Sequence, residues 1–580
     1  MDGQAPAFRT PFAVGLATLA LSAGCMTSLL RSSPESVVIA EPTGADNARY
    51  IARYTQPQGL DYVKIEAVAL ATGLDGSGSD PAPSSQRAAL LTEMSREKVE
   101  NPNRVLLSPD TSLVLLRTVL RPGVQEGDRI DVEVRVPARS ETKSLRSGWV
   151  LAARMSELAA LDGIIRSGHV LAIAEGPILV DPSTEEDKAE AVQGRILGGA
   201  VATKSRSLGL IIGHEHRSKR MLLEITKAIN LRMHIYRGGR KEGVATPKDE
   251  TFIEIAVHDR YKENVSRMVR VLREVVIDES PAELQHRLTL LESQLLDPLT
   301  ASKASLRLEA IGTDQAAEIL ERGAKSSDPE VRFYSAEALA YLDRTSAVEP
   351  LVAAAREQRA FRVNALAALS TMDNVLAYEG LRSLLSTSSV ETRYGAFRSL
   401  WLMNENDPLV SGERMGGQFT YHVLDVEGPP VIHLTRSHRP EIVLFGVGQQ
   451  LQLPLMLDAG RHILVNGMQG SEITVSKFAA GEEPQKRVVP PTVDAVVRAI
   501  VELGGAYPDV VQALQQAKRD GALASRLEVD ALPKTGRAYD REAEIGSDDV
   551  EALEDADEVD AVEPDAYRVA TPLPDLFSGR

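Results

Sequence analysis

The chain has 580 residues and a net charge of −17, from 82 acidic and 65 basic residues. At about 100–200 residues per domain this length allows several domains. A hydrophobic content of 43% is enough to bury a core through most of the sequence. Aromatic residues make up only 4% and the charge is acidic, so a nucleic-acid-binding surface is not predicted.

The N-terminus carries an export signal. An apolar run at residues 12–23 is too short to span a membrane but is typical of a signal peptide. It is followed by Leu21-Ser22-Ala23-Gly24-Cys25, which resembles a bacterial lipobox, in which the cysteine is diacylated. We therefore predict a lipoprotein-type signal peptide at 1–25, lipidation of Cys25, and a location in the periplasm or cell envelope with a lipid anchor in a membrane. An ordinary cleaved signal peptide is the alternative.

Cys25 is the one cysteine, which excludes an intrachain disulfide and a cysteine-rich zinc site. Residues 26–61 contain few large apolar side chains over most of their length and are predicted to be a tether.

Two strands are predicted between residues 62 and 136. Residues 63–71 run into a glycine-rich loop at 73–80, which lacks P-loop and Rossmann spacing and is interpreted as a tight turn. Residues 129–136 alternate between apolar and charged side chains, which predicts a strand with one buried face. Asp128 and Asp131 are candidate carboxylates there, but residues on opposite faces of a strand do not converge.

Further strands are predicted at 144–151, 170–173 and 194–201, with a turn at 176–180. Residues 218–230 are predicted to form a helix with Ser218 as its N-cap. A strand at 251–257, a helix from Tyr261 and a strand at 274–277 complete what we expect to be a small α/β sandwich.

Five motifs in this region resemble the flagellar P-ring protein family, the periplasmic ring subunit of the flagellar basal body. They include Gly127-Asp128-Arg129-Ile130-Asp131-Val132 and the segments 70–80, 143–148, 174–180 and 194–201. The resemblance covers residues 62–277. It implies mixed α/β modules, self-association into a ring, contact with the flagellar rod or peptidoglycan, and no enzymatic activity or cofactor. Heterologous contacts that close by rotation produce such rings.

Residues 278–408 are predicted to be HEAT-like helical repeats. Val331-Arg332, Phe361-Arg362 and Thr392-Arg393 recur at steps of about 30 residues, and each is followed by apolar residues at helical spacing. Asp328-Pro329-Glu330 is a helix start. Such repeats form either a concave surface that binds a protein partner or a packed spacer.

The C-terminal third is predicted to contain three segments. Residues 409–480 form a β-rich module, with strands at 442–445, 451–457, 463–465 and 473–475, and residues 481–532 form a helical segment. Residues 533–580 are interpreted as a disordered acidic tail, because 541–565 contain 12 acidic residues and one arginine. A clamp for basic partners is the alternative for this tail.

Two histidine motifs are the remaining candidates for chemistry. In strand geometry His214 and His216 would share a face, but no third metal ligand lies nearby in the sequence, so no metal is predicted. His258-Asp259 precedes a helix, where Asp259 is a natural N-cap.

The fold class predicted is therefore α+β and multidomain. The function predicted is a non-enzymatic structural subunit of the cell envelope, similar to the flagellar P-ring. The alternative is a lipid-anchored envelope scaffold that uses the P-ring-like module and the repeats to bind another protein, with no flagellar role.

Overall fold

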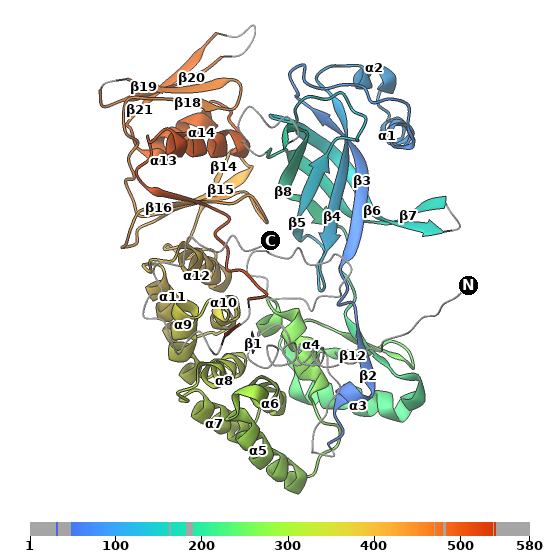
Figure 1. Cartoon of the computed structure of the whole chain (residues 1–580). Coiled ribbons are helices and arrows are strands. Elements are labelled where there is room, and N and C mark those ends of the chain that lie inside the picture. The colour runs from blue at the N-terminus through green and yellow to red at the C-terminus, as the bar shows by residue number, and fades with distance from the viewer. Residues whose placement is uncertain are drawn as a thin grey trace, which may run out of the picture.

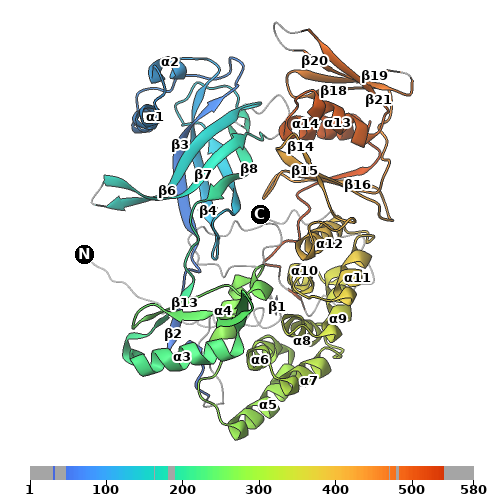
Figure 2. The same ribbon diagram turned by 180° about the vertical axis from the view of Figure 1, so that it is seen from behind.

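A computed structural model describes residues 31–32, 48–161, 164–180, 190–468, 470–478, 483–537 and 539–540. The chain folds into four units, which we call the barrel, the α/β module, the repeats and the C-terminal unit (Figure 1). Seen from either side, the units follow one another around a closed circuit, so that the C-terminal unit returns to the barrel (Figure 2). The α+β fold class predicted from the sequence is confirmed.

The barrel is a closed antiparallel sheet with strand order β3-β4-β5-β8-β7-β6. Its strands are β3 (Val63–Thr72), β4 (Ser112–Leu120), β5 (Arg129–Arg135), β6 (Trp149–Leu161), β7 (Ile164–Pro177) and β8 (Gln193–Ala202). In β5, Val132 and Val134 point into the barrel core as the alternation predicts. The resemblance implied mixed α/β modules over residues 62–277, with strands at their edges. The strands instead close on one another, and closure removes the edges.

The elements of the α/β module lie partly before and partly after the barrel in the sequence. Its sheet has the order β12-β13-β9-β2. The elements are η1 (Ile51–Arg53), β2 (Thr55–Gln58), β9 (Gly209–Ile212), η3 (His214–His216), α3 (Lys219–Arg232), β10 (His234–Arg237), β11 (Arg240–Gly243), β12 (Ala245–Pro247), β13 (Phe252–Ile255), η4 (Asp259–Tyr261) and α4 (Val265–Arg273). Because β2 precedes the barrel and pairs with β9 after it, the barrel is an insertion in this module. Residues 48–58 are therefore folded and are not part of a tether.

Capping fixes the helix starts in the α/β module. The Ser218 side chain accepts a hydrogen bond from the Met221 N–H, as predicted for the start of α3. The start of α4 differs from the prediction. Asn264 caps it by accepting from the Arg267 N–H, while His258 caps the short helix η4, in which Asp259 is the first residue. The expected strand at 274–277 is reduced to an isolated bridge between Val276 and Tyr50.

The repeats form two rows of helices. The helices are α5 (Pro281–Leu295), α6 (Pro298–Ile311), α7 (Asp314–Gly323), α8 (Pro329–Tyr341), η5 (Thr345–Ala347), α9 (Val348–Glu357), α10 (Arg362–Ser370), α11 (Val375–Leu384) and α12 (Val390–Met403). Helices α6, α8, α10 and α12 contact one another in an inner row, which α7, α9 and α11 cover from outside. The predicted repeats and the cap at Asp328 are confirmed.

Nearly every residue of the inner helices α8 and α10 is buried. A helix that is buried all round must be covered on both sides. The outer row covers one side, and the α/β module, the C-terminal unit and the segment after residue 529 cover the other. The inner face of the repeats is therefore occupied by the chain itself.

The C-terminal unit contains two sheets and two helices around one core. The sheet orders are β14-β15-β17-β16-β22 and β18-β19-β20-β21. The elements are β14 (Glu413–Met415), β15 (Phe419–Leu424), β16 (Val431–Leu434), β17 (Glu441–Phe445), β18 (Leu455–Ala459), β19 (Ile463–Gly467), β20 (Ile473–Lys477), β21 (Gln485–Val489), α13 (Val493–Glu502), α14 (Tyr507–Arg519) and β22 (Arg526–Val529). Leu444, Val475 and Ile500 belong to the same core cluster, so the β-rich and helical segments pack as one unit.

Candidate assembly surface

Two sides of the barrel wall are covered by other parts of the chain. Helices α1 (Ser85–Arg96) and α2 (Pro102–Leu106) cover the outside of β3 and β4, where Leu70 and Leu113 pack against Leu90. The C-terminal unit covers another side, where Leu179 and Leu197 of the barrel unit join the core of that unit. Apolar residues on these sides are therefore buried.

The third side of the barrel wall, on β6 and β7, is open. Trp149, Leu151 and Ile173 point outward from these strands and are 40%, 46% and 40% exposed. Their neighbours Val150 and Ala174 point inward and are buried. We call these three exposed side chains the open wall. Apolar side chains gathered on adjacent strands are typical of a protein–protein contact.

The hairpin of β6 and β7 extends beyond the barrel and points away from the C-terminal unit (Figures 1 and 2). β6 pairs with β3 as far as Ser156, whereas the pairs from Leu158↔Ser167 to Leu161↔Ile164 join only β6 and β7 among the described strands. We call the paired segments 158–161 and 164–167 the arm. Its sequence includes Leu158, Leu161, Ile164 and Ile165. A two-stranded ribbon is marginally stable when it stands alone.

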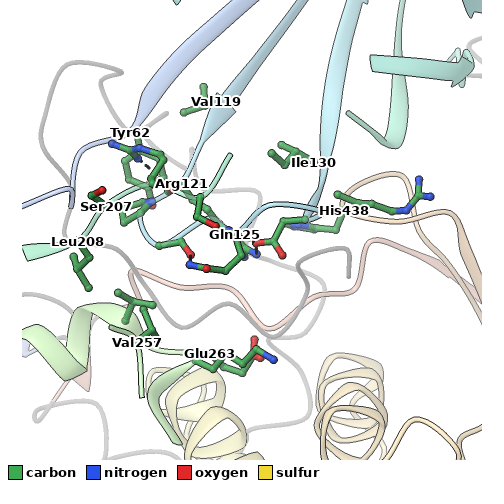
Figure 3. Close-up of a pocket in the computed structure, with 18 of the residues that line it drawn as sticks. Tyr62, Val119, Arg121, Gln125, Ile130, Ser207, Leu208, Val257, Glu263 and His438 are labelled. Atoms are coloured by element: carbon green, nitrogen blue, oxygen red, sulfur yellow. Dashed lines mark hydrogen bonds and ion pairs between the residues drawn. The ribbon is translucent and has the colours of Figure 1, made fainter. Parts of the chain in front are cut away.

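A cavity of about 1560 Å³ lies where the barrel, the α/β module and the C-terminal unit meet (Figure 3). Its labelled lining residues are Tyr62, Val119, Arg121, Gln125 and Ile130 from the barrel unit, Ser207, Leu208, Val257 and Glu263 from the α/β module, and His438 from the C-terminal unit. Arg121 pairs with Asp128 at 3.6 Å, and Arg206 donates to the carbonyl oxygen of Asp61 at 2.5 Å. These charged side chains therefore interact with other groups of the same chain and help to hold the units together at this junction.

The predicted carboxylates Asp128 and Asp131 do not form a pair. Asp128 accepts a hydrogen bond from the Gln125 N–H at 2.9 Å. Asp131 accepts from the Gly198 N–H at 2.8 Å and from the His438 N–H, and so ties the barrel to the C-terminal unit. Burial raises the pKa of Asp131, although these hydrogen bonds lower it. Sequence alternation placed Asp131 on the outer face correctly but could not identify His438 as its partner.

A buried ionic junction joins the α/β module to the repeats. Arg267 on α4 pairs with Glu309 on α6 at 2.6 Å and with Glu337 on α8 at 2.5 Å. The Tyr261 hydroxyl donates to the other oxygen of Glu309 at 2.6 Å. Burial by itself would lower the pKa of Arg267, but the two carboxylates raise it, so the guanidinium stays charged.

A second buried junction joins the repeats to the C-terminal unit. Glu441 accepts hydrogen bonds from the Tyr394 hydroxyl at 2.8 Å and from Arg398 at 3.2 Å, and His422 lies 3.3 Å from it. Burial would raise the pKa of Glu441, but Arg398 and His422 lower it well below its usual range. The ring of His433 stacks on Tyr394 at 3.8 Å, and burial lowers the pKa of His433 to about 3.

His214 and His216 belong to neither junction, whereas His258 packs edge-on against Tyr261 with ring centroids 6.0 Å apart. His214, Glu215 and His216 form the 3-10 helix η3 and not a strand, so the shared face predicted for the two histidines is wrong. His216 packs edge-on against Tyr54 at 5.0 Å. Within the described ranges, no group of three or more His, Cys, Asp or Glu side chains is placed to hold a metal ion. Cys25 lies outside the described residues.

Sequence reasoning did not single out the junction residues, because their partners lie on other elements far away in the sequence. Arg267, Glu309, Arg398 and Glu441 are all buried. For Glu309 on α6 and Arg398 on α12 the sequence carries a signal that could have found them, because the residues on either side of each charge are buried in mostly buried helices. In the part of the chain that the structure describes, none of the helices has the length and apolar content needed to span a membrane.

The units are held together by buried ion pairs, and the barrel carries the open wall and the arm on one side. Residues 51–285 match the family model of the flagellar P-ring protein, and residues 317–401 match the model of HEAT repeats. The order of the two matches is the one predicted from the sequence. The first match spans the α/β module and the barrel, and indicates a P-ring-like structural role. No curated protein matches the chain.

Proposed function

We propose that this chain is a non-enzymatic ring subunit of the cell envelope that surrounds the flagellar rod in the periplasm. The single observation that supports this most is the extent of the P-ring match. Residues 51–285 begin at η1 and end within α5, so they take in the complete α/β module with its inserted barrel. A match that coincides with a folded unit supports shared architecture and not only a shared motif.

The open wall and the arm supply the contact between copies in this proposal. Ring formation requires a heterologous contact, in which one surface of a subunit meets a different surface of the next. The arm lies on the side of the molecule opposite the C-terminal unit, so a neighbour related by rotation would meet it from that side. Burying Trp149, Leu151 and Ile173, which are 40–46% exposed, would remove apolar area of the barrel wall from water.

Electron microscopy of the purified full chain, with its lipid in detergent and with peptidoglycan and rods added, tests ring formation. We expect closed rings, and the Leu151→Asp variant to remain monomeric. Leu231→Asp is the matched control, because Leu231 is 79% exposed on α3, away from the open wall. Monomers of the unaltered chain under all these conditions would contradict the proposal.

The scaffold without a flagellar role remains the second candidate. It is favoured by the length of chain outside the P-ring match, which includes the HEAT match and the whole C-terminal unit. Deleting the gene and imaging the basal bodies separates the two. Loss of the ring around the rod supports the first proposal, and intact basal bodies with full motility support the scaffold.

A further inference from the structure

The segment after β22 crosses from the C-terminal unit to the inner row of the repeats. We call residues 530–540 the strap. Its start is fixed to the C-terminal unit: the Asp530 N–H donates to the Leu434 carbonyl at 2.9 Å, and its carboxylate accepts from the Arg436 N–H at 2.7 Å. Disorder was predicted from residue 533 onward. Pro533 and Tyr539 are instead buried, whereas residues 541–580 lie outside the described residues.

Pro533 occupies a seat on α12 that exists because residue 395 is glycine. A Cβ atom at Gly395 would lie 2.8 Å from Cγ of Pro533 and 2.5 Å from Cδ1 of Leu366. Glycine inside a helix costs about 1 kcal/mol relative to alanine. The helix therefore carries a residue that weakens it at the point where the proline ring packs.

Glu391, in the first turn of α12, holds the middle of the strap. Its carboxylate accepts from the Lys534 N–H at 2.9 Å and from Arg537 at 2.9 and 3.1 Å. Arg362 of α10 donates to the same carboxylate at 2.9 Å and keeps it in place. Charge-assisted hydrogen bonds of this kind are stronger than neutral ones and favour arginine in the bound segment.

Tyr539 ends the contact on an aromatic surface. Its ring stacks on Phe361 with centroids 5.0 Å apart, and Phe361 stacks on Phe333 at 4.3 Å. Tyr539 is 5% exposed. The backbone of Tyr539 and Asp540 also pairs with β1 (Arg31–Ser32) as the short strand β23.

We propose that the inner face of α8, α10 and α12 is a peptide-binding groove, and that the strap is its resident ligand. The ligand class is an extended segment with proline, arginine four residues later and an aromatic residue two residues after that. A partner protein with such a segment binds the groove by displacing the strap. The proline packs in the seat at Gly395, the arginine binds the carboxylate of Glu391, and the aromatic ring stacks on Phe361.

A fluorescent peptide with the sequence of residues 531–540 tests this proposal by anisotropy. The receptor is the full chain with Arg537→Ala and Tyr539→Ala, which removes two of the three side-chain contacts that hold the strap in the groove, so that the peptide can displace Pro533 from its seat while the rest of the fold stays in place. We expect the peptide to bind this variant. We expect at least about tenfold weaker binding to the unaltered chain, whose strap competes at high effective concentration.

Adding Glu391→Gln to the double variant removes the charge that holds Arg537, and we expect at least about tenfold weaker binding of the peptide. Glu379→Gln is the matched control, because Glu379 lies on the outer helix α11 and its side chain is 55% exposed. Circular dichroism checks that each variant keeps its helix content. No binding to the folded double variant, or equal binding with Glu391→Gln, overturns the proposal.

Discussion

Arg267 of the α/β module and Glu309 of the repeats form an ion pair at 2.6 Å in which the side chains are 3% and 0% exposed. The contact joins the P-ring-like part of the chain to a part that the P-ring match does not reach. Two units joined by a desolvated pair are not independent domains on a flexible linker. The repeats are therefore a fixed extension of the P-ring-like part.

The Arg267–Glu309 pair predicts a large loss of stability when one partner is removed. Arg267→Leu removes the guanidinium that pairs directly with the buried Glu309 and Glu337, and we expect a loss of about 3–5 kcal/mol in the free energy of unfolding. Arg322→Leu is the control. It breaks a pair with Glu292 in which both side chains are about half exposed, and we expect at most about 1 kcal/mol. Denaturant unfolding of the two variants measures the difference, and equal losses would contradict the prediction.

Buried histidines predict that stability falls in acid. Burial lowers the pKa of His433 to about 3 and of His438 to about 4, whereas in the unfolded chain both lie near about 6.5. At a pH between the folded-state and unfolded-state pKa values, the unfolded chain binds more protons than the folded chain does. The free energy of unfolding therefore falls as the pH falls from about 6.5, by about 1.4 kcal/mol per pH unit for each histidine.

Glu441 acts in the same direction at lower pH. Its folded-state pKa is depressed by Arg398 and His422 against the effect of burial, so its contribution to stability is present above about pH 4.5 and is lost below it.

The His433→Phe variant tests the histidine prediction. Its free energy of unfolding, measured from pH 7 to pH 4, should fall less steeply with falling pH than that of the unaltered chain. His286→Gln, at an exposed position on α5, should keep the original slope.

The open wall predicts that assembly depends on a few apolar side chains. Trp149→Ala and Ile173→Asp should each weaken association about tenfold or more, because a buried apolar side chain contributes about 1.5–3 kcal/mol. Because both residues are 40% exposed, each change should lower the melting temperature of the monomer less than the same change at a fully buried position. Sedimentation velocity measures the association, and calorimetry checks the fold. Unchanged sedimentation would place the contact between copies elsewhere.

The lipobox-like motif predicts that Cys25 carries the membrane anchor. Cys25→Ser should move the chain from the membrane fraction to the soluble periplasmic fraction and abolish incorporation of labelled fatty acid. Ser28→Ala, three residues later, should leave both unchanged. Membrane association of the Cys25→Ser variant without any lipid label would refute the anchor.

Local sequence signals predicted the local structure correctly. Ser218 and Asp328 cap the helices predicted to follow them, and the alternation around Val132 gives strand β5 with the predicted buried face. The repeat period placed α8, α10 and α12, because each copy carries its own helical pattern of apolar residues. These features depend on residues within one or two turns of each other.

Contacts between distant residues could not be predicted in this way. Closure of the barrel depends on pairs such as Thr72↔Trp149 and Arg129↔Val201, which no local pattern specifies. The strap was assigned to a disordered tail because Pro533 and Tyr539 are isolated apolar residues in a polar sequence. Their burial depends on Gly395 and Phe361, more than a hundred residues earlier.

The circuit of units has a mechanical consequence. Asp131 with His438, and Arg461 with the Leu74 carbonyl at 3.2 Å, connect the last unit to the barrel, so a load on the barrel reaches the rest of the chain by two parallel routes. If one connection opens, the other route keeps the separated surfaces close, and they rejoin at high effective concentration. Such a frame withstands torque and repeated shear better than units strung on a single linker.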